Sequence, residues 1–168
     1  MDRCGGCGFE YDLEQATGAA SAIVSGSAAI AAHLQAADAT DLRARPQPGV
    51  WSPLEYGCHV RDVLLVQRER VLATRRMDRP SFDPMGRDER VEHDGYLAQD
   101  PLDVARQLND AAALLANVLN RLDPTDWSRT VMYNYPKQLE RTLKWVAVHT
   151  EHEIQHHLHD IEAQLPRP

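Results

Sequence analysis

The residues best suited to chemistry are histidines, and five of the eight lie within the eleven residues from His149 to His159. An even spread along the chain would put less than one histidine in that interval. Histidine is a mediocre helix former, so Glu, Lys or Arg would serve better on a helix face that only meets solvent. Neutral imidazoles, in contrast, are common ligands of divalent metals. The enrichment therefore indicates a metal site on this segment.

Two pairs with i, i+4 spacing in this segment could hold a metal, because residues four apart lie one turn apart on the same side of a helix. At about 100° per residue, Glu153 and His157 border the apolar face of the predicted helix. His152 and His156 lie on a separate stripe, turned further from the core. The i, i+4 spacing alone does not decide which of the two pairs binds the metal.

The string from His152 to His156 also reads His-Glu-x-x-His, the signature of a class of zinc proteases. Such enzymes need a third ligand, either a glutamate well beyond the motif or a histidine six residues past its second histidine. Glu162 occupies that second position. A zinc hydrolase of this type is therefore the least favoured interpretation.

A second candidate site begins at the N-terminus, where Cys4 and Cys7 form a Cys-x-x-Cys pair. Such a pair is half of a tetrahedral zinc site, which needs two further donors. We expect a structural zinc site completed by His152 and His156, or by His149 in place of one of them. The alternative is a flexible tail with free thiols. A redox pair is disfavoured because no βαβ pattern is present.

Four helical segments, at about 12–37, 52–77, 100–122 and 139–165, must position these donors. The second has a strong start signal, with Ser52 as N-cap, Pro53 at the first position and Glu55 completing a capping box. No alternation typical of strands is evident. We therefore predict an all-α, up-down-up-down four-helix bundle over residues 12–168, with the Cys-x-x-Cys segment 1–11 packed on it.

The connection from residue 78 to residue 100 is long for a compact domain, and such loops often cover a site. Surface ion pairing is the favoured interpretation of Arg61, Asp62 and Asp160, ahead of a role in orienting ligand imidazoles. Cys58 has the character of a small buried hydrophobic residue.

Composition narrows the class of protein. The chain has 168 residues, 43% of them hydrophobic, enough for one domain with a real core. Its formal charge is −7 and basic residues are not clustered, which argues against nucleic-acid binding. No signal peptide and no apolar run approaching ~20 residues is apparent, so we expect no membrane partner and a cytoplasmic location.

Two motifs resemble those of a known family. Trp51-Ser-Pro-Leu-Glu55 with Cys58-His-Val-Arg-Asp62 resembles the second-helix motif of the DinB-like (DinB/YfiT) metalloprotein superfamily, and His149 to Ile161 resembles its last-helix motif. The likeness covers residues 10–165. It is closest to an actinobacterial branch with an N-terminal Cys-x-x-Cys-Gly-Phe-x-Tyr-Asp, as in Cys4 to Asp12 here.

The resemblance implies a ligand set. In that superfamily, one histidine of the second helix and an i, i+4 pair of the last helix bind Zn²⁺, Ni²⁺ or Fe²⁺, which points to His59. The pair is His/His in many members and Glu/His in the mycothiol-dependent maleylpyruvate isomerases. In these isomerases the pair leads into a His-His-x-Asp-Leu tail, and aligning its aspartate with Asp160 places the pair on Glu153 and His157. We prefer these three ligands, with His152 and His156 as the alternative pair.

Three protein ligands leave coordination positions open, as in catalytic metal sites. The resemblance implies a thiol S-transferase or related isomerase or lyase that acts on a small molecule, with mycothiol as cosubstrate. The alternative is a metal-binding or stress-response protein without turnover. Zinc suits thiolate and imidazole donors best, and Ni²⁺ or Fe²⁺ stays open at the His59 site. A homodimer is a possible assembly.

Overall fold

The computed structural model describes residues 3–134 and 137–165, so the outer ends of both predicted units, residues 1–2 and 166–168, lie outside the described part. Four long helices dominate it: α1 (Ala19–Ala36), α3 (Pro53–Arg76), α5 (Pro101–Leu119) and α7 (Leu143–Gln164). The shorter elements between and before them are η1 (Leu13–Gly18), α2 (Ala39–Arg43), β1 (Ser81–Phe82), α4 (Arg87–His93), η2 (Tyr96–Ala98), α6 (Pro124–Ser128), β2 (Thr130–Asn134) and β3 (Gln138–Thr142).

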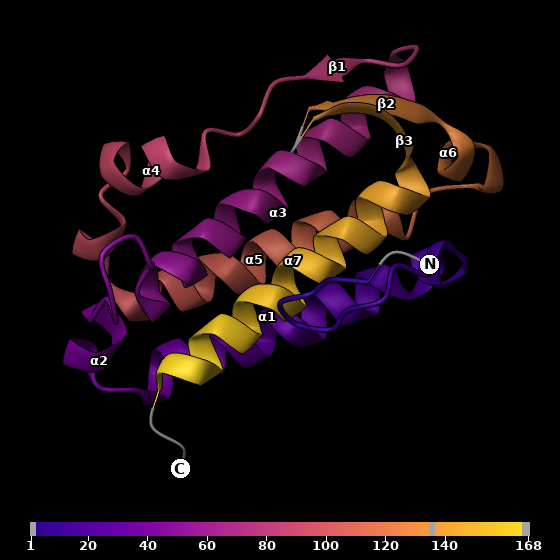
Figure 1. The fold of residues 1–168 in the computed structure, drawn as a ribbon. Helices are drawn as coiled ribbons and strands as arrows, with labels where there is room; N and C mark the ends of the chain where they lie inside the picture. Colours follow the sequence, from indigo (N-terminus) through magenta and orange to yellow (C-terminus); the bar gives the residue numbers. More distant parts are fainter. Residues whose placement is uncertain (1–2, 135–136, 166–168) are drawn as a thin grey trace.

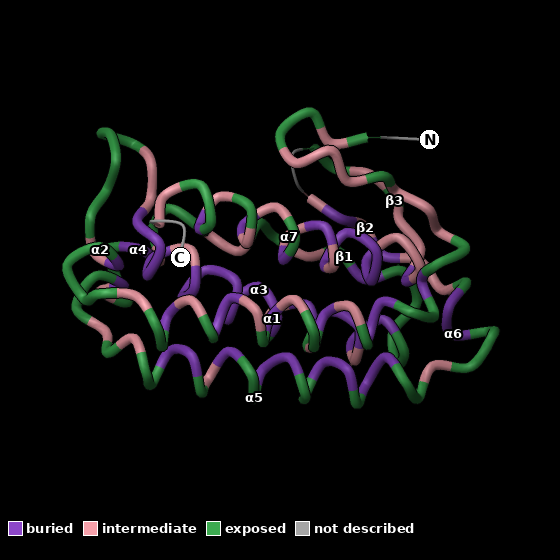
Figure 2. The backbone as a smooth tube through the Cα atoms, turned by 90° about the horizontal axis from the view of Figure 1, so that it is seen from below, coloured by how far each residue is buried: buried purple, intermediate pink, exposed green. Residues whose placement is uncertain are grey.

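The four long helices pack around one core in an order that differs from their order in the chain. Helices α1 and α3 each pack against both α5 and α7. Consequently α1 and α3 lie at opposite corners, although they are the first two long helices. Helix α3 is the most enclosed, with buried residues along most of its length (Figure 2). Its neighbour α7 runs beside it and bears the histidines.

The directions of the helices also differ from the up-down-up-down prediction. Helices α3 and α5 run the same way, and α1 and α7 run the opposite way (Figure 1). The cause is the connection after α3, which passes back along the bundle through β1, α4 and η2. Helix α5 therefore starts at the end where α3 started. One long crossover of this kind replaces a short turn between neighbours.

The prediction of an all-α chain is wrong in one part, because β1, β2 and β3 form a small sheet in that order. Strand β2 pairs antiparallel with β3 and parallel with β1. Within β2, the buried Val131 and Tyr133 alternate with less buried neighbours, the period-two pattern of a strand. The signal spans only five residues, which is why it passes for a connection in the sequence.

The predicted start of the second long helix is confirmed. The Glu55 amide donates to Ser52 Oγ at 3.3 Å, and the Ser52 amide donates to Glu55 Oε2 at 2.8 Å. Pro53 is the first helical residue. Both amides of this capping box would otherwise lack a partner at the helix terminus, so the box fixes where α3 begins.

The segment Leu13–Ala36, which joins η1 to α1, is long and apolar enough to cross a membrane by length and composition. This corrects the expectation that no stretch in the chain approaches that character. In the structure α1 packs against α5 and α7, and Ile23, Ile30 and Leu34 are fully buried. It therefore serves as a core helix of the bundle.

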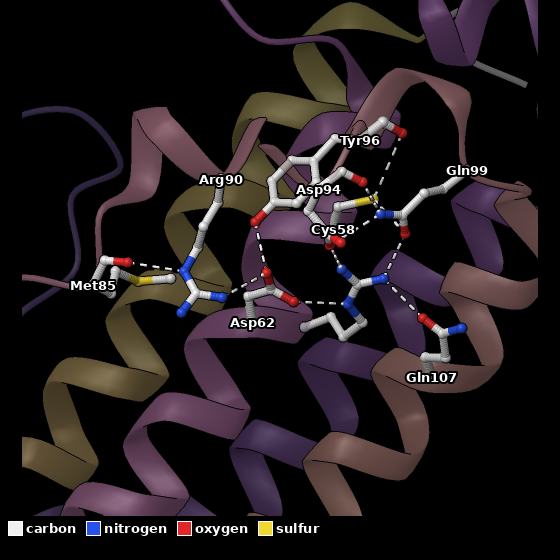
Figure 3. A network of polar contacts seen from close by, with 9 residues as sticks. Cys58, Asp62, Met85, Arg90, Asp94, Tyr96, Gln99 and Gln107 are labelled. Atoms are coloured by element: carbon white, nitrogen blue, oxygen red, sulfur yellow. Dashed lines mark hydrogen bonds and ion pairs between the residues drawn. The ribbon is translucent and has the colours of Figure 1, made fainter. Parts of the chain in front are cut away.

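A buried polar network fastens the crossover to α3 (Figure 3). Asp62 accepts hydrogen bonds from Tyr96 Oη at 2.7 Å and from Arg61 Nε at 2.8 Å. Arg90 of α4 also donates to Asp62, at 3.2 Å. Arg61 and Asp62 are only 7% and 5% exposed, so the expected surface ion pair is in fact buried. Its partners lie in the crossover, which no local pattern in α3 reveals.

Candidate functional site

Helices α3 and α7 bring three possible metal donors together. His59 Nε2 lies 4.0 Å from Glu153 Oε2, and His157 Nε2 lies 3.8 Å from the same oxygen. All three donor atoms lie within 4.8 Å of one another. Ligands of a tetrahedral ion with bonds near 2.1 Å are roughly 3.4 Å apart. The two distances to Glu153 exceed that spacing by about half an ångström, so a small movement of the carboxylate would bring it to ligand distance from both imidazoles.

His157 is held in the orientation that ligation needs. Its Nδ1 lies 2.9 Å from Asp160 Oδ2, which leaves Nε2 facing Glu153. A carboxylate on the outer nitrogen fixes the tautomer and ring direction of a metal-binding histidine. Asp160 is thus placed to orient the His157 ring, whereas the sequence analysis favoured a surface ion pair for Asp160. The outer nitrogen of His59, Nδ1, is buried and lacks a hydrogen-bond partner within the described part of the chain.

The protonation states of Glu153 and His157 favour the binding of a cation. Burial lowers the pKa of His157, which keeps its imidazole neutral and able to ligate. Burial alone would raise the pKa of Glu153, but the imidazoles of His152 and His59 outweigh it and hold that pKa well below its usual range. Glu153 is therefore a carboxylate beside the neutral imidazole of His157, and a divalent ion would offset the negative charge of Glu153.

A pocket of about 280 Å³ opens directly beside these donors. His59 and Glu153 form part of its lining, together with His149. The crossover supplies another side through Pro84 to Glu89, as expected for a long loop that covers a site. The remaining lining residues come from α3 and β2: Val63, Val66, Gln67, Arg70, Tyr133 and Asn134.

The polar lining of this pocket was missed by sequence reasoning. Gln67 Nε2 donates to Tyr133 Oη at 2.7 Å, and the buried Gln67 Oε1 has no hydrogen-bond partner among the described residues. The Arg70 guanidinium lies 4.9 Å from the centre of the Tyr133 ring. Spacing offers one clue, since positions 63, 67 and 70 follow His59 on the same face of α3. Tyr133 depends on a strand that was not predicted.

A second group of donors joins the N-terminal segment to α7. Donor atoms of Cys4, Cys7, His152 and His156 lie within 4.8 Å of one another. Cys4 Sγ lies 3.6 Å from His156 Nδ1. A hydrogen bond from the Cys7 backbone N–H is the main cause that lowers the pKa of Cys4 to about 6, which favours its thiolate.

The two i, i+4 pairs of α7 therefore face different partners. Glu153 and His157 face His59, whereas His152 and His156 face the cysteine pair. The structure does not bring His59 together with His152 and His156 anywhere in the described residues. Two further groups of three share members with these sets: His149, His152 and Glu153, and His156, His157 and Asp160.

The other predicted donor and the third cysteine lie apart from the cysteine group. His149 lines the pocket, and its Nδ1 lies 2.9 Å from Tyr11 Oη. Cys58 is buried in α3, where burial raises the pKa of its thiol to about 12. A thiol with that pKa stays protonated, so Cys58 has the character of a buried apolar residue.

Comparison with known proteins identifies a family for most of the chain. The model of the DinB superfamily matches residues 23–161. The chain belongs to the DinB superfamily. The structure of YfiT from Bacillus subtilis, described as a probable metal-dependent hydrolase with an unusual four-helix bundle topology, is similar with a TM-score of 0.78 at 15% identity. The similarity covers 92% of this chain and 89% of YfiT. No protein of curated function matches the sequence.

The region matched by the DinB superfamily model contains one donor group and only part of the other. It includes His59, Glu153 and His157 but begins well after Cys4 and Cys7. At 15% identity, the similarity to YfiT concerns the fold. The residues of the first set fit a divalent metal on their own geometry and charge. The cysteine pair is an addition to the matched DinB region.

Proposed function

We propose that the protein is a divalent-metal-dependent enzyme whose metal is held by His59, Glu153 and His157. The pocket beside this donor set carries the proposal, because two of the three donors line it. Three protein donors leave coordination positions free, and here those positions would face a cavity. A purely structural ion would instead be closed off by a fourth protein ligand.

We further propose thiol transfer, or a related isomerase or lyase step, with mycothiol as cosubstrate. When bound, the metal supplies a Lewis acid that brings the pKa of a thiol or water close to neutrality. The Glu/His pair on α7 supports this reaction class, because it resembles the pair of the mycothiol-dependent isomerases. A pocket of about 280 Å³ is at the small end for ligand sites, so it suits the reacting end of such a thiol.

The chain's own residues would bind and orient the small-molecule substrate. Arg70 offers a positive charge in the pocket. Gln67 Oε1, which has no hydrogen-bond partner among the described residues, can accept a hydrogen bond from a substrate. Pro84 and Met85 of the crossover bring apolar atoms to the other side, which would limit access of water. We propose no nucleic-acid or membrane partner, a cytoplasmic location and a homodimeric assembly.

Hydrolysis is the second candidate reaction, because YfiT is described as a probable metal-dependent hydrolase. The His-Glu-x-x-His form of zinc hydrolase is disfavoured by the geometry. Its histidines, His152 and His156, face the cysteine pair, and its glutamate, Glu153, faces His59. The remaining alternative is metal binding without turnover, as in a stress-response protein.

The test is a turnover screen of the metal-loaded protein. Mycothiol would be combined with electrophiles including maleylpyruvate, and esters and amides would be offered without thiol. We expect thiol-dependent turnover that His59→Ala abolishes. His33→Ala, on the partly exposed face of α1, should leave it unchanged.

Two other outcomes would contradict thiol transfer. Turnover that needs no thiol, and is lost in His59→Ala, would assign hydrolysis. No turnover, together with no change in the spectrum of the cobalt-substituted protein on adding mycothiol, would favour the non-catalytic alternative.

A further inference from the structure

We propose that Cys4, Cys7, His152 and His156 bind a structural zinc ion that fastens the N-terminal segment to α7. The segment crosses over α7 before the chain enters η1 (Figure 1), and it lies outside the region matched by the DinB family model. Two thiolates and two imidazoles make a complete tetrahedral set for zinc, with no position left for substrate. The four donor atoms already lie within 4.8 Å of one another.

The backbone of the segment is shaped for this contact. The Gly8 amide donates to the Cys4 carbonyl at 2.9 Å, and the Cys4 amide donates to the Phe9 carbonyl at 2.8 Å, which closes a tight turn around both cysteines. A side chain at Gly6 would place Cβ only 2.8 Å from His156 Cε1. Glycine at this position therefore lets the turn approach the imidazole closely.

An unsatisfied nitrogen supports the site independently. His152 Nε2 is buried and has no hydrogen-bond partner within residues 3–134 and 137–165. A buried polar atom without a partner destabilises the folded state. The other nitrogen of His152, Nδ1, lies 2.9 Å from Tyr11 Oη and 3.5 Å from Glu153 Oε1. Coordination of zinc through Nε2 would give the free nitrogen its partner.

Tyr11 would connect this zinc site to the pocket. Its hydroxyl lies 2.9 Å from Nδ1 of both His152 and His149. A phenol has one proton, so it donates to one imidazole and accepts from the other. Zinc on His152 Nε2 requires the proton of that ring on Nδ1, and Tyr11 must then donate to His149. This leaves the His149 proton on Nε2, which lies 4.0 Å from Glu153 Oε1 in the pocket.

The zinc site does not depend on the proposed catalytic function. It would stand if the His59 centre proved to have no turnover, because its evidence lies in the N-terminal segment and the outer stripe of α7. The tests of the zinc site therefore measure the metal content of the protein and the protonation of its histidine rings, and they do not require enzymatic activity.

Metal content tests the site. Elemental analysis of protein purified without chelator should approach two ions per chain, one for each donor group, and Cys4→Ser/Cys7→Ser should lose one. Cys58→Ser is the matched control and should lose none. Cobalt-substituted His59→Ala should keep a thiolate-to-cobalt charge-transfer band. Unchanged stoichiometry in the double variant, absence of that band, or a Cys4–Cys7 disulfide in its place would overturn the proposal.

Nitrogen-15 NMR of the histidine rings tests the connection through Tyr11. In the zinc-loaded protein we expect His149 to be protonated at Nε2. Tyr11→Phe should keep the full metal content yet release this preference, and Cys4→Ser/Cys7→Ser should release it as well. A His149 tautomer that is the same in all three proteins would overturn the connection while leaving the zinc site to stand on its metal content.

Discussion

At the residue scale, the histidines of α7 serve two sites because adjacent helical positions point about 100° apart. His156 and His157 are neighbours in the chain, yet their rings are inclined at 83° and belong to different donor groups. One helix can therefore present a set of donors to the bundle interior and another to the N-terminal segment.

The assignment of pairs predicts opposite effects of two substitutions. In the Cys4→Ser/Cys7→Ser background, where only the His59 site remains, His157→Ala should abolish metal binding because it removes a ligand. His152→Ala should leave the ion in place. Elemental analysis after dialysis measures both. If His152→Ala empties the site and His157→Ala does not, the alternative pair, His152 and His156, binds with His59.

Asp160 should influence the metal without touching it. Asp160→Ala removes the acceptor of the His157 Nδ1 hydrogen, and loss of such an orienting partner lowers metal affinity by roughly 10–100-fold. Competition with a chromophoric chelator measures this in the Cys4→Ser/Cys7→Ser background. Glu162→Ala, an exposed carboxylate on the same helix, is the control and should leave affinity unchanged. Equal affinities in both variants would show that Asp160 has no such role.

At the element scale, Gly26 sets how closely α1 approaches α7. A Cβ at this position would lie 2.6 Å from Ile154 Cγ2, and Ile154 is buried next to Glu153. We expect Gly26→Ala to lower the free energy of unfolding by about 1–3 kcal/mol, despite the better helix propensity of alanine. Gly18→Ala, with open space at its Cβ, should raise it by up to about 1 kcal/mol.

Urea denaturation of both variants checks the sign of each effect. A Gly26→Ala protein that is as stable as Gly18→Ala would mean that α1 and α7 can separate without cost. The position of Ile154 would then not constrain the neighbouring donor Glu153.

The N-terminus of α3 should contribute a pH-dependent part of the stability. Burial alone would raise the pKa of Glu55, but hydrogen bonds from Arg45 and from the Ser52 amide outweigh it and lower that pKa below 4.5. The contribution is thus present above the unfolded value of 4.5 and is lost as pH falls towards the folded value. Glu55→Gln should therefore cost more stability at neutral pH than in acid.

Denaturation of the wild-type protein and of Glu55→Gln, from neutral pH to below pH 4.5, measures the difference in the free energy of unfolding between them. The gap between the two proteins should shrink as the solution becomes more acidic. A gap that is independent of pH would show that the carboxylate charge does not stabilise the start of α3.

At the scale of the whole molecule, bound metal should stabilise the fold because each donor group joins segments far apart in the chain. A ligand at 100 times its Kd adds about 2.7 kcal/mol if only the folded state binds it. We expect chelation to lower Tm and added zinc to restore it. A variant that combines His59→Ala with Cys4→Ser/Cys7→Ser should show no such shift. A wild-type Tm that is unchanged after proven metal removal would contradict this.

Features that depend on local patterns could be predicted from the amino-acid sequence. The capping box of Ser52 and Glu55 marked the start of α3, and the two motifs indicated the DinB superfamily. The spacing of Glu153 and His157 along one helix placed them at the border of the core. Each of these signals lies within a few turns of one helix, where periodicity and end effects are decided by neighbouring residues.

The helix directions, the small sheet and the pocket could not be predicted in this way, because they depend on how distant segments pack together. The directions depend on where the crossover after α3 ends, which its composition does not state. Strand β2 is stabilised by pairing with β1 and β3, and its own five residues carry little signal. Arg61 and Asp62 are buried because the crossover covers them, and Tyr133 lines the pocket because β2 lies beside α3. These features are contacts between distant segments, so they arise only when the chain has folded.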